Sequence, residues 1–137
     1  ARGGASKSEV IISDGPIDYP KATIVDACMA MTQEAADKYA VGIKDGGILL
    51  LDDDYVHKHP EGNFKLYRLP IMRMAKTDIG REIVANVVAL GAMIGLTGVV
   101  SKEAGEEAVL RKVPEAFKEL NKKAFNLGYE KSKELLN

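Results

Sequence analysis

The sequence predicts an α/β fold in which helices cover both faces of a mostly parallel or mixed sheet, arranged as three α/β/α layers. Two nearly continuous apolar runs, Thr23–Met31 and Ile48–Leu51, are typical of strands that are buried on both faces. Helical patterns follow the first run and fill the C-terminal third of the chain. Buried strands that alternate with helices indicate a parallel sheet between two helical layers.

The strands and the first helix follow in order. Glu9–Ile12 is predicted as a strand, and after the strand in 23–31 the Thr32 side chain is placed to cap a helix. That helix should run from Gln33 to about Ile43 and end at the turn residues 45–47. The next strands are Ile48–Leu51 and Lys65–Leu69, which Pro70 ends.

The connection between the first two predicted strands is short. Ser13 to Thr23 is less than the dozen or so residues that a parallel crossover requires. We therefore expect either a mixed sheet or first strands that are not neighbours.

The chain after Pro70 is predicted to be helical. A short helix should span Met72–Ile79 and stop at Gly80, and an apolar helix should run from Arg81 to about Leu96. Ser101 is placed to cap a helix over 102–112, and Pro114 stands at the start of a last helix. That helix should reach about Leu136, with an apolar face formed by Val113, Phe117, Leu120, Ala124 and Leu127. Together these elements describe a Rossmann-like domain.

Length, charge and cysteine content exclude several classes of protein. A chain of 137 residues has room for one domain, and its net charge of −1 argues against nucleic-acid binding by bulk positive charge. A single cysteine, Cys28, excludes a disulfide framework, a zinc ribbon and a cluster ligated by cysteines of one chain. The apolar helix would be about 24 Å long, short of the ~30 Å of a bilayer core, which favours a buried helix over a membrane span.

The start of the chain has neither an initiator methionine nor the apolar core of a signal peptide. We expect the chain to be a piece of a longer polypeptide. We also expect it to be cytoplasmic.

A run of polar residues follows the predicted strand Ile48–Leu51. Asp52, Asp53 and Asp54 stand where α/β sheets bind ligands, and His57 and His59 come soon after. These residue types could form a hard-metal or acid–base site. A polar loop rich in turn-forming aspartates explains the same residues, and three adjacent carboxylates cannot all face one ion.

A glycine-rich segment opens the chain. Residues 2–8 combine flexible backbone with two cations and two hydroxyl groups, so Arg2, Gly3, Gly4 and Ser6 could hold a phosphate or carboxylate. The glycine spacing matches neither a Walker loop nor a dinucleotide-binding turn. The alternative interpretation is that residues 2–8 form a frayed terminus without a ligand.

Several isolated residues within the predicted elements are explained by structural roles. Cys28 lies in an apolar strand, where its thiol should be inert. Asn86 should be a hydrogen-bonded amide in the core, and the alternative is that it orients a neighbouring loop or subunit. Gly91 and Gly95 should allow close approach of a strand or helix. The five methionines are expected to fill the core. No set of nucleophile, base and orienting group emerges, so a subunit or accessory domain is the better interpretation.

Several segments together resemble the gamma subunits of 2-oxoacid:ferredoxin oxidoreductases. The matching residues occur in the family's order over nearly the whole chain: Ala1–Asp14, Ile17–Pro20, Met31–Ala35, Gly46–Leu49, Asn86–Ala92 and Thr97–Ser101. The Arg2-Gly3-Gly4-Ala5-Ser6 form is most similar to the 2-oxoglutarate type. Family members normally begin with a strand, a Gly-Gly-Gln-Gly turn and a helix, so the resemblance implies one gamma-type domain over 1–137 without its first strand and helix.

The resemblance implies a subunit that assembles an enzyme and is not catalytic alone. In this family a 2-oxo acid is oxidatively decarboxylated with coenzyme A, and the electrons pass to ferredoxin. Thiamine diphosphate and iron–sulfur clusters are expected in the complex, held by alpha, beta and ferredoxin-like subunits, with no membrane or nucleic acid involved. Arg2, Gly3, Gly4 and Ser6 match the family motif and would contact an anion or a partner subunit.

Two other functions remain open from the residues. One is a stand-alone nucleotide- or coenzyme A-binding module that uses the strand ends near Asp52 and the Arg2 segment. The other is a metal-dependent hydrolase built on Asp52, Asp54, His57 and His59.

Overall fold

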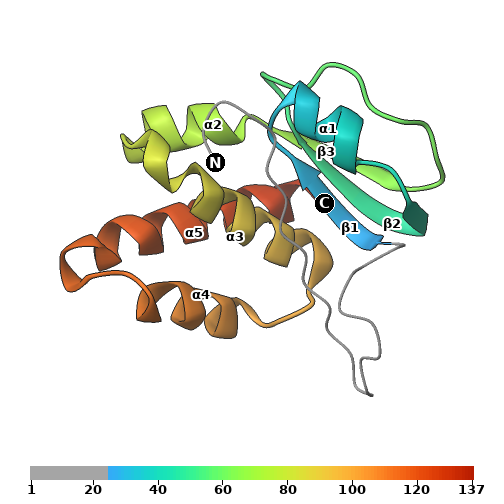
Figure 1. The fold of residues 1–137 in the computed structure, drawn as a ribbon. Coiled ribbons are helices and arrows are strands. Elements are labelled where there is room, and N and C mark those ends of the chain that lie inside the picture. Colours follow the sequence, from blue (N-terminus) through green and yellow to red (C-terminus); the bar gives the residue numbers. More distant parts are fainter. Residues whose placement is uncertain (1–24) are drawn as a thin grey trace.

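Three parallel strands form the sheet in the computed structural model, which describes residues 25–137 (Figure 1). The strands are β1 (Val25–Ala30), β2 (Ile43–Asp52) and β3 (Lys65–Leu69), in the order β1-β2-β3. The predicted α/β class and parallel pairing are thereby confirmed. The predicted strand Glu9–Ile12 and its connection to Thr23 lie outside the described residues.

Helices lie on both faces of this sheet (Figure 1). Helix α1 (Gln33–Tyr39) covers one face, while α3 (Ala85–Thr97) and α5 (Lys118–Leu135) lie on the other. Side chains of β2 alternate between the two layers because a strand has a period of two. Leu49 and Leu51 pack with residues of α1, whereas Leu50 joins the cluster on the α3 side, and all three are fully buried.

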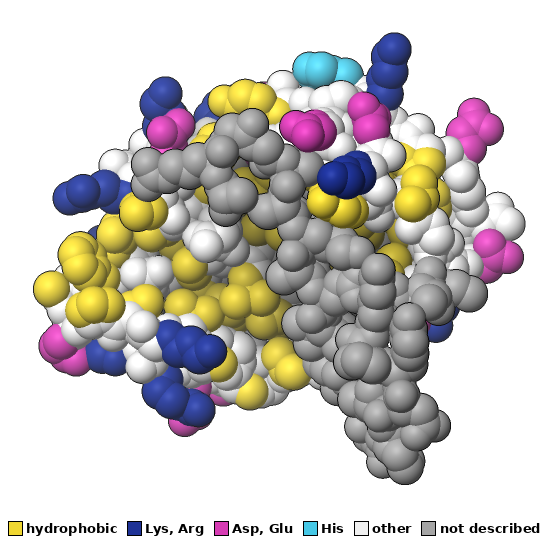
Figure 2. Space-filling view, viewed as in Figure 1, with side chains coloured by type: hydrophobic (Ala, Val, Ile, Leu, Met, Phe, Trp, Pro, Cys, Tyr) yellow, Lys and Arg dark blue, Asp and Glu magenta, His cyan; other side chains and the backbone are white. Residues whose placement is uncertain are grey.

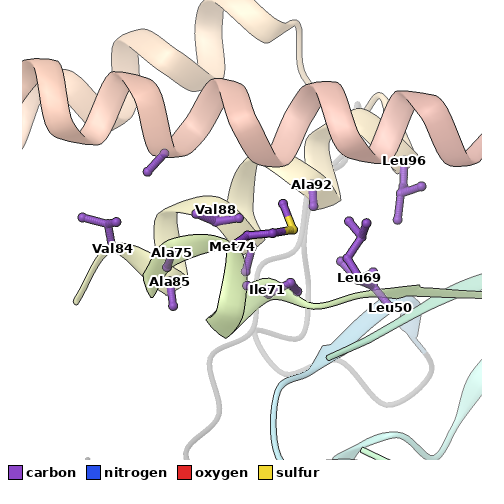
Figure 3. Close-up of a cluster of buried hydrophobic side chains, with 12 residues drawn as sticks. Leu50, Leu69, Ile71, Met74, Ala75, Val84, Ala85, Val88, Ala92 and Leu96 are labelled. Atoms are coloured by element: carbon purple, nitrogen blue, oxygen red, sulfur yellow. The ribbon is translucent and has the colours of Figure 1, made fainter. Parts of the chain in front are cut away.

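The larger core lies between the sheet and the helices (Figure 3). Leu50 and Leu69 from the sheet meet Ile71 and Met74, and Val88 and Ala92 of α3 close the cluster from the helical side. Met74 is buried, and the other four methionines, Met29, Met31, Met72 and Met93, are partly buried and pack against this core. The expectation that methionines fill the core is confirmed.

Strand β1 and helix α1 differ from their predicted form. In β1 only Ala30 is buried and the other residues are half-buried or exposed, so burial on both faces was a wrong expectation for this strand. The Thr32 hydroxyl accepts a hydrogen bond from the Ala35 amide (3.1 Å), which confirms the cap.

Helix α1 ends at Tyr39, four residues before the predicted end. The chain turns at Gly42, whose φ of +74° suits glycine, and residue 43 already pairs with Val25 as a strand. The glycines predicted to stop the helix lie inside β2. Gly46, at φ +82°, donates to the carbonyl of Asn63 (2.6 Å), and the β1–β2 register shifts here.

The predicted helix over 72–79 is a short α-helix followed by a π-helix. Helix α2 (Ile71–Arg73) continues into η1 (Met74–Ile79), and the Ala75 carbonyl accepts hydrogen bonds from both Gly80 (2.9 Å) and Arg81 (3.0 Å). Gly80 ends the segment at φ +91°, as expected. A single turn, η2 (Glu82–Val84), then leads into α3.

The C-terminal helices begin where the sequence indicated. Helix α4 (Lys102–Arg111) is capped by Ser101, whose hydroxyl accepts from the Ala104 amide (3.1 Å). Pro114 precedes the turn η3 (Glu115–Phe117), and α5 follows. The buried face of α5 was predicted incorrectly in part, because Phe117 is half-exposed and the buried positions are Asn121, Ala124, Phe125, Gly128 and Ser132.

Close backbone contact between α3 and α5 explains that difference. A Cβ atom at Gly91 would collide with the Phe125 carbonyl, and one at Gly128 would collide with the Val88 carbonyl. Small residues therefore line this contact, where large apolar side chains would force the helices apart. The close approach predicted for Gly91 and Gly95 is confirmed, with α5 as the partner helix.

No helix within residues 25–137 has the length and apolar character needed to cross a bilayer. Helix α3 has 13 residues, about 20 Å, and most of it is buried in the core.

Candidate functional site

The strands β2 and β3 end side by side, at the edge where open α/β sheets usually bind ligands. Asp52 is the last residue of β2, and Asp53 and Asp54 follow it. Arg68 of β3 and Arg73 of α2 bring two cations to the same edge. The sequence therefore gathers three carboxylates and two guanidinium groups at this edge.

Asp52 is fully buried, and both of its carboxylate oxygens hold backbone amides. Oδ1 accepts a hydrogen bond from the Asp54 amide (2.9 Å), and Oδ2 accepts one from the Met72 amide (2.9 Å). The first bond shapes the turn after β2, and the second ties that turn to the start of α2. Asp52 thus has a structural role in place of the metal or acid–base role considered from the sequence.

The other two aspartates are paired with arginines. Arg73 forms a bidentate ion pair with Asp54, with N–O distances of 2.9 and 3.1 Å. Arg68 lies 3.7 Å from Asp53 and also donates to the Val56 carbonyl (2.6 Å). These contacts link the β2–β3 loop to β3 and α2, and they neutralise the carboxylates locally.

The two histidines do not join the aspartates in a metal site. Within residues 25–137 no group of three potential ligands lies close enough to hold an ion. His59 Nδ1 lies 2.9 Å from the Pro60 carbonyl, and its ring meets Phe64 edge to face. The structure therefore does not support the metal-dependent hydrolase considered for Asp52, Asp54, His57 and His59.

Gln33 fixes the loop that carries these histidines, a role that the sequence analysis missed. Its Oε1 accepts from the amides of His57 (2.8 Å) and Lys58 (3.1 Å), and its Nε2 donates to the Lys58 carbonyl (2.9 Å). Gln33 is 24 residues from His57 in sequence. Nothing in the local pattern reveals such a contact, since Gln33 is simply the first residue of α1.

Cys28 has the inert character predicted for it. It is half-buried in β1, and its Sγ lies 3.7 Å from the Tyr39 carbonyl, as a weak donor. Burial raises the pKa of the Cys28 thiol because the thiolate would lose its hydration. A thiol that stays protonated is a poor nucleophile and a poor metal ligand.

The predictions for Asn86 and for the opening segment have different outcomes. Asn86 was expected as a core amide, but it is exposed on α3 because the helix turns this position away from both the sheet and α5. Arg2, Gly3, Gly4 and Ser6 lie outside the described residues.

A shallow surface hollow lies between α4 and the start of α5. Lys102, Glu103, Glu106, Arg111 and Lys118 are among its lining residues. Lys118 donates to the Leu110 carbonyl, and Arg111 lies 3.5 Å from Glu107. Because its charges are of both signs and already paired in part, the hollow shows no preference for an ionic ligand.

Comparisons with known proteins agree on one family. The family model described as pyruvate ferredoxin/flavodoxin oxidoreductase matches residues 1–131. The chain is 50% identical to the 2-oxoglutarate synthase subunit KorC of Methanocaldococcus jannaschii, over 98% of this chain and 73% of that protein. It is also 33% identical to the ketoisovalerate oxidoreductase subunit VorA of Methanothermobacter thermautotrophicus, over 79% of this chain but only 22% of VorA.

A solved structure shares the fold. The keto/oxoacid ferredoxin oxidoreductase gamma subunit from Geobacter sulfurreducens superimposes with a TM-score of 0.76 and 62% identity. The match covers 78% of this chain and 63% of that one, so this chain spans a little under two thirds of that gamma subunit.

Proposed function

Because this chain belongs to the pyruvate ferredoxin/flavodoxin oxidoreductase family, we propose that it is the gamma-type subunit of a 2-oxoglutarate:ferredoxin oxidoreductase. The observation that carries the proposal is the 50% identity to a 2-oxoglutarate synthase subunit along 98% of the chain. The gamma-subunit structure from Geobacter sulfurreducens, at 62% identity, supports the gamma assignment.

The proposed complex converts a 2-oxo acid into a coenzyme A thioester. The bond between the carboxylate and the carbonyl carbon breaks and releases carbon dioxide, and the acyl carbon is oxidised as the thiol of coenzyme A bonds to it. Two electrons and the proton of the thiol are released, and the iron–sulfur clusters of the complex would pass the electrons one at a time to ferredoxin. Thiamine diphosphate and the clusters would serve this chemistry on subunits other than this one, and coenzyme A would bind within the complex.

We propose that this chain contributes structure and assembly to the complex. The chemistry of its described residues supports that role. The carboxylates at the sheet edge are engaged by backbone amides and arginines, and its single thiol is kept protonated by burial. An iron–sulfur cluster needs several thiolates, which one cysteine cannot provide.

The proposed partners are alpha and beta subunits that hold thiamine diphosphate, a ferredoxin-like subunit, and ferredoxin as electron acceptor. We place this complex in the cytoplasm.

The opening segment is part of the proposal. We propose that Arg2, Gly3, Gly4 and Ser6 contact an anion or a partner subunit, because guanidinium groups and glycine-rich backbone bind phosphates and carboxylates. Arg2→Ala in the assembled complex should raise the KM for coenzyme A if the anion is its phosphate. If Arg2 instead holds a partner, the same substitution should weaken assembly and leave that KM unchanged. A variant that changes neither quantity would remove this segment from the proposal.

The test is reconstitution of the complex with this chain included or left out. The assay measures ferredoxin reduction that depends on 2-oxoglutarate and coenzyme A, with pyruvate and 2-oxoisovalerate as competing substrates. We expect the chain alone to be inactive, the full set of subunits to be active, and 2-oxoglutarate to give the highest kcat/KM. Turnover by the isolated chain, or a preference for pyruvate, would contradict the proposal.

A further inference from the structure

Helix α3 carries no charged residue along its 13 positions, Ala85–Thr97. A helix at the surface of a protein normally places charged side chains on its outer face, while a helix that is apolar all round is normally buried on every side. The composition of α3 is therefore that of a helix with partners on all of its faces.

Most faces of α3 have partners within this chain. Gly91 and Gly95 lie against the backbone of α5, and Ala92 packs toward Leu50 of the sheet. On another side, Ile94 packs near Gly105 of α4. These contacts bury the helix against α4, α5 and the sheet.

One stripe of α3 and its preceding turn remains open. It consists of Ile83, Asn86, Leu90 and Met93, which recur at intervals of three and four residues and so share one side of the helix. Ile83 is 78% exposed and Leu90 is 43% exposed, while Met93 is half-buried against the larger core and forms the inner edge of the stripe. Hydrophobic side chains gather on the molecular face where α3 lies in front of α5 (Figure 2). We call these four residues the α3 stripe.

The match to VorA indicates what kind of partner this domain has. VorA is 33% identical over 79% of this chain, yet the match occupies only 22% of VorA. The equivalent domain is there joined covalently to a much longer polypeptide, which keeps the two at a high effective concentration. In KorC of Methanocaldococcus jannaschii, by contrast, the match occupies 73% of the protein and leaves no room for such a polypeptide. In a KorC-type subunit a non-covalent interface must therefore replace that connection.

We propose that the α3 stripe docks this chain onto a partner subunit equivalent to the remainder of VorA. The inference rests on the proposed function and specifies the surface by which the subunit is held. The partner should present an apolar, uncharged groove for Ile83 and Leu90. It should also offer one donor and one acceptor for the Asn86 amide, because a buried amide needs hydrogen-bond partners.

Charged substitutions in the stripe test this surface. Ile83→Asp and Leu90→Asp should each weaken binding to that partner subunit by about tenfold or more, since both remove an apolar anchor and bury a charge. The controls are Val41→Asp and Phe117→Asp, which alter side chains of similar exposure (60% and 50%) on other elements. They should stay within about threefold of the wild-type affinity. All four chains are compared by circular dichroism so that a folding defect is separated from a binding defect.

A labelling experiment identifies the occupant independently. In a Cys28→Ser background, Leu90→Cys should react rapidly with a maleimide in the isolated chain and slowly in the assembled complex. Slow labelling of the isolated chain at every concentration would indicate cover by its own residues, such as 1–24. Labelling that slows as concentration rises would indicate a second copy. Either result would overturn the docking proposal.

The two proposals fail in different ways. If the wild-type chain does not bind the partner subunit, the proposed function and the docking surface both fail. If the wild type binds and the stripe variants bind equally well, the docking surface alone is wrong.

Discussion

Asp52 shows how one residue can stand at a typical ligand-binding position and yet serve the fold. The carboxyl end of β2 is where a parallel sheet commonly presents functional side chains. Here the carboxylate is turned inward and divided between two backbone amides, of Asp54 and Met72. Its neighbours Asp53 and Asp54 pair with arginines, so three adjacent aspartates divide between two different local roles.

Asp52→Ala should lower the free energy of unfolding by about 2–4 kcal/mol, because two backbone amides would lose their acceptors. Urea denaturation of the full chain measures this change. The matched control is Asp53→Ala, which removes an exposed carboxylate 3.7 Å from Arg68 and should cost less than about 1 kcal/mol. Equal losses in both variants would show that the buried hydrogen bonds of Asp52 have no special weight.

Gln33→Ala should release the β2–β3 loop without unfolding the domain. The amides of His57 and Lys58 both donate to Gln33 Oε1, so their hydrogen exchange should become roughly fivefold or more faster. Exchange at Ala36, whose amide donates to the Thr32 carbonyl, should not change. Glu34→Ala, at the adjacent exposed position, should leave the loop amides at the wild-type rate. Unchanged exchange at His57 would argue against Gln33 as the loop anchor.

At the scale of elements, the pairing of α3 with α5 organises the helical layer. Glycines on both helices allow their backbones to touch, with Gly91 against Phe125 and Gly128 against Val88. Ser132 adds a hydroxyl that is buried at the same contact and donates to the Tyr129 carbonyl (2.8 Å). The contact therefore depends on small residues, and enlarging them should separate the helices.

Gly128→Ala should destabilise the protein by about 1–3 kcal/mol, although alanine is the better helix former by about 1 kcal/mol. The reason is that the added methyl group meets the backbone of Val88, which cannot rotate away. Gly105→Ala is the matched control, since its methyl group meets the far end of Ile94, which can adjust, as well as the Phe125 ring. Thermal or urea unfolding measures the stability of both variants relative to the wild-type protein. A Gly128→Ala protein as stable as the wild type would mean that the helices are not held in close contact.

At the scale of the whole molecule, one buried cluster connects the sheet with the helices. Leu50 of the central strand packs in the same cluster as Val88 and Ala92 of α3 and Ala124 of α5. Loss of this contact should therefore affect both layers together, so we expect a single cooperative unfolding transition.

Leu50→Ala should lower the free energy of unfolding by about 2–5 kcal/mol, as expected for a cavity in a well-packed core. The measurement is urea unfolding followed both by far-ultraviolet circular dichroism and by tyrosine fluorescence, and the two curves should coincide. Leu66→Ala, on the exposed side of β3, should cost less than about 1 kcal/mol. Two separate transitions for the wild-type protein would show that the layers unfold independently.

Local patterns predicted most of the elements correctly. The caps at Thr32 and Ser101, the strand Lys65–Leu69 and the stop at Gly80 depend on side chains and backbone angles within a few residues. The end of α1 was wrong because Gly46 bends a strand in this fold, a role set by pairing with β1 and by the Asn63 carbonyl. Glycine alone does not distinguish a helix end from a bulge.

The sequence by itself determined the α/β class, the helical C-terminal third and the resemblance to oxidoreductase gamma subunits, because these depend on hydrophobic periodicity and on residues in a fixed order. Only the tertiary structure decided the roles of Asp52, Gln33 and Gly128. Each of them acts on a residue that is about 20 or more positions away in the chain: Met72, His57 or Val88. The identity of such a partner follows from how the strands and helices pack, which no local pattern contains.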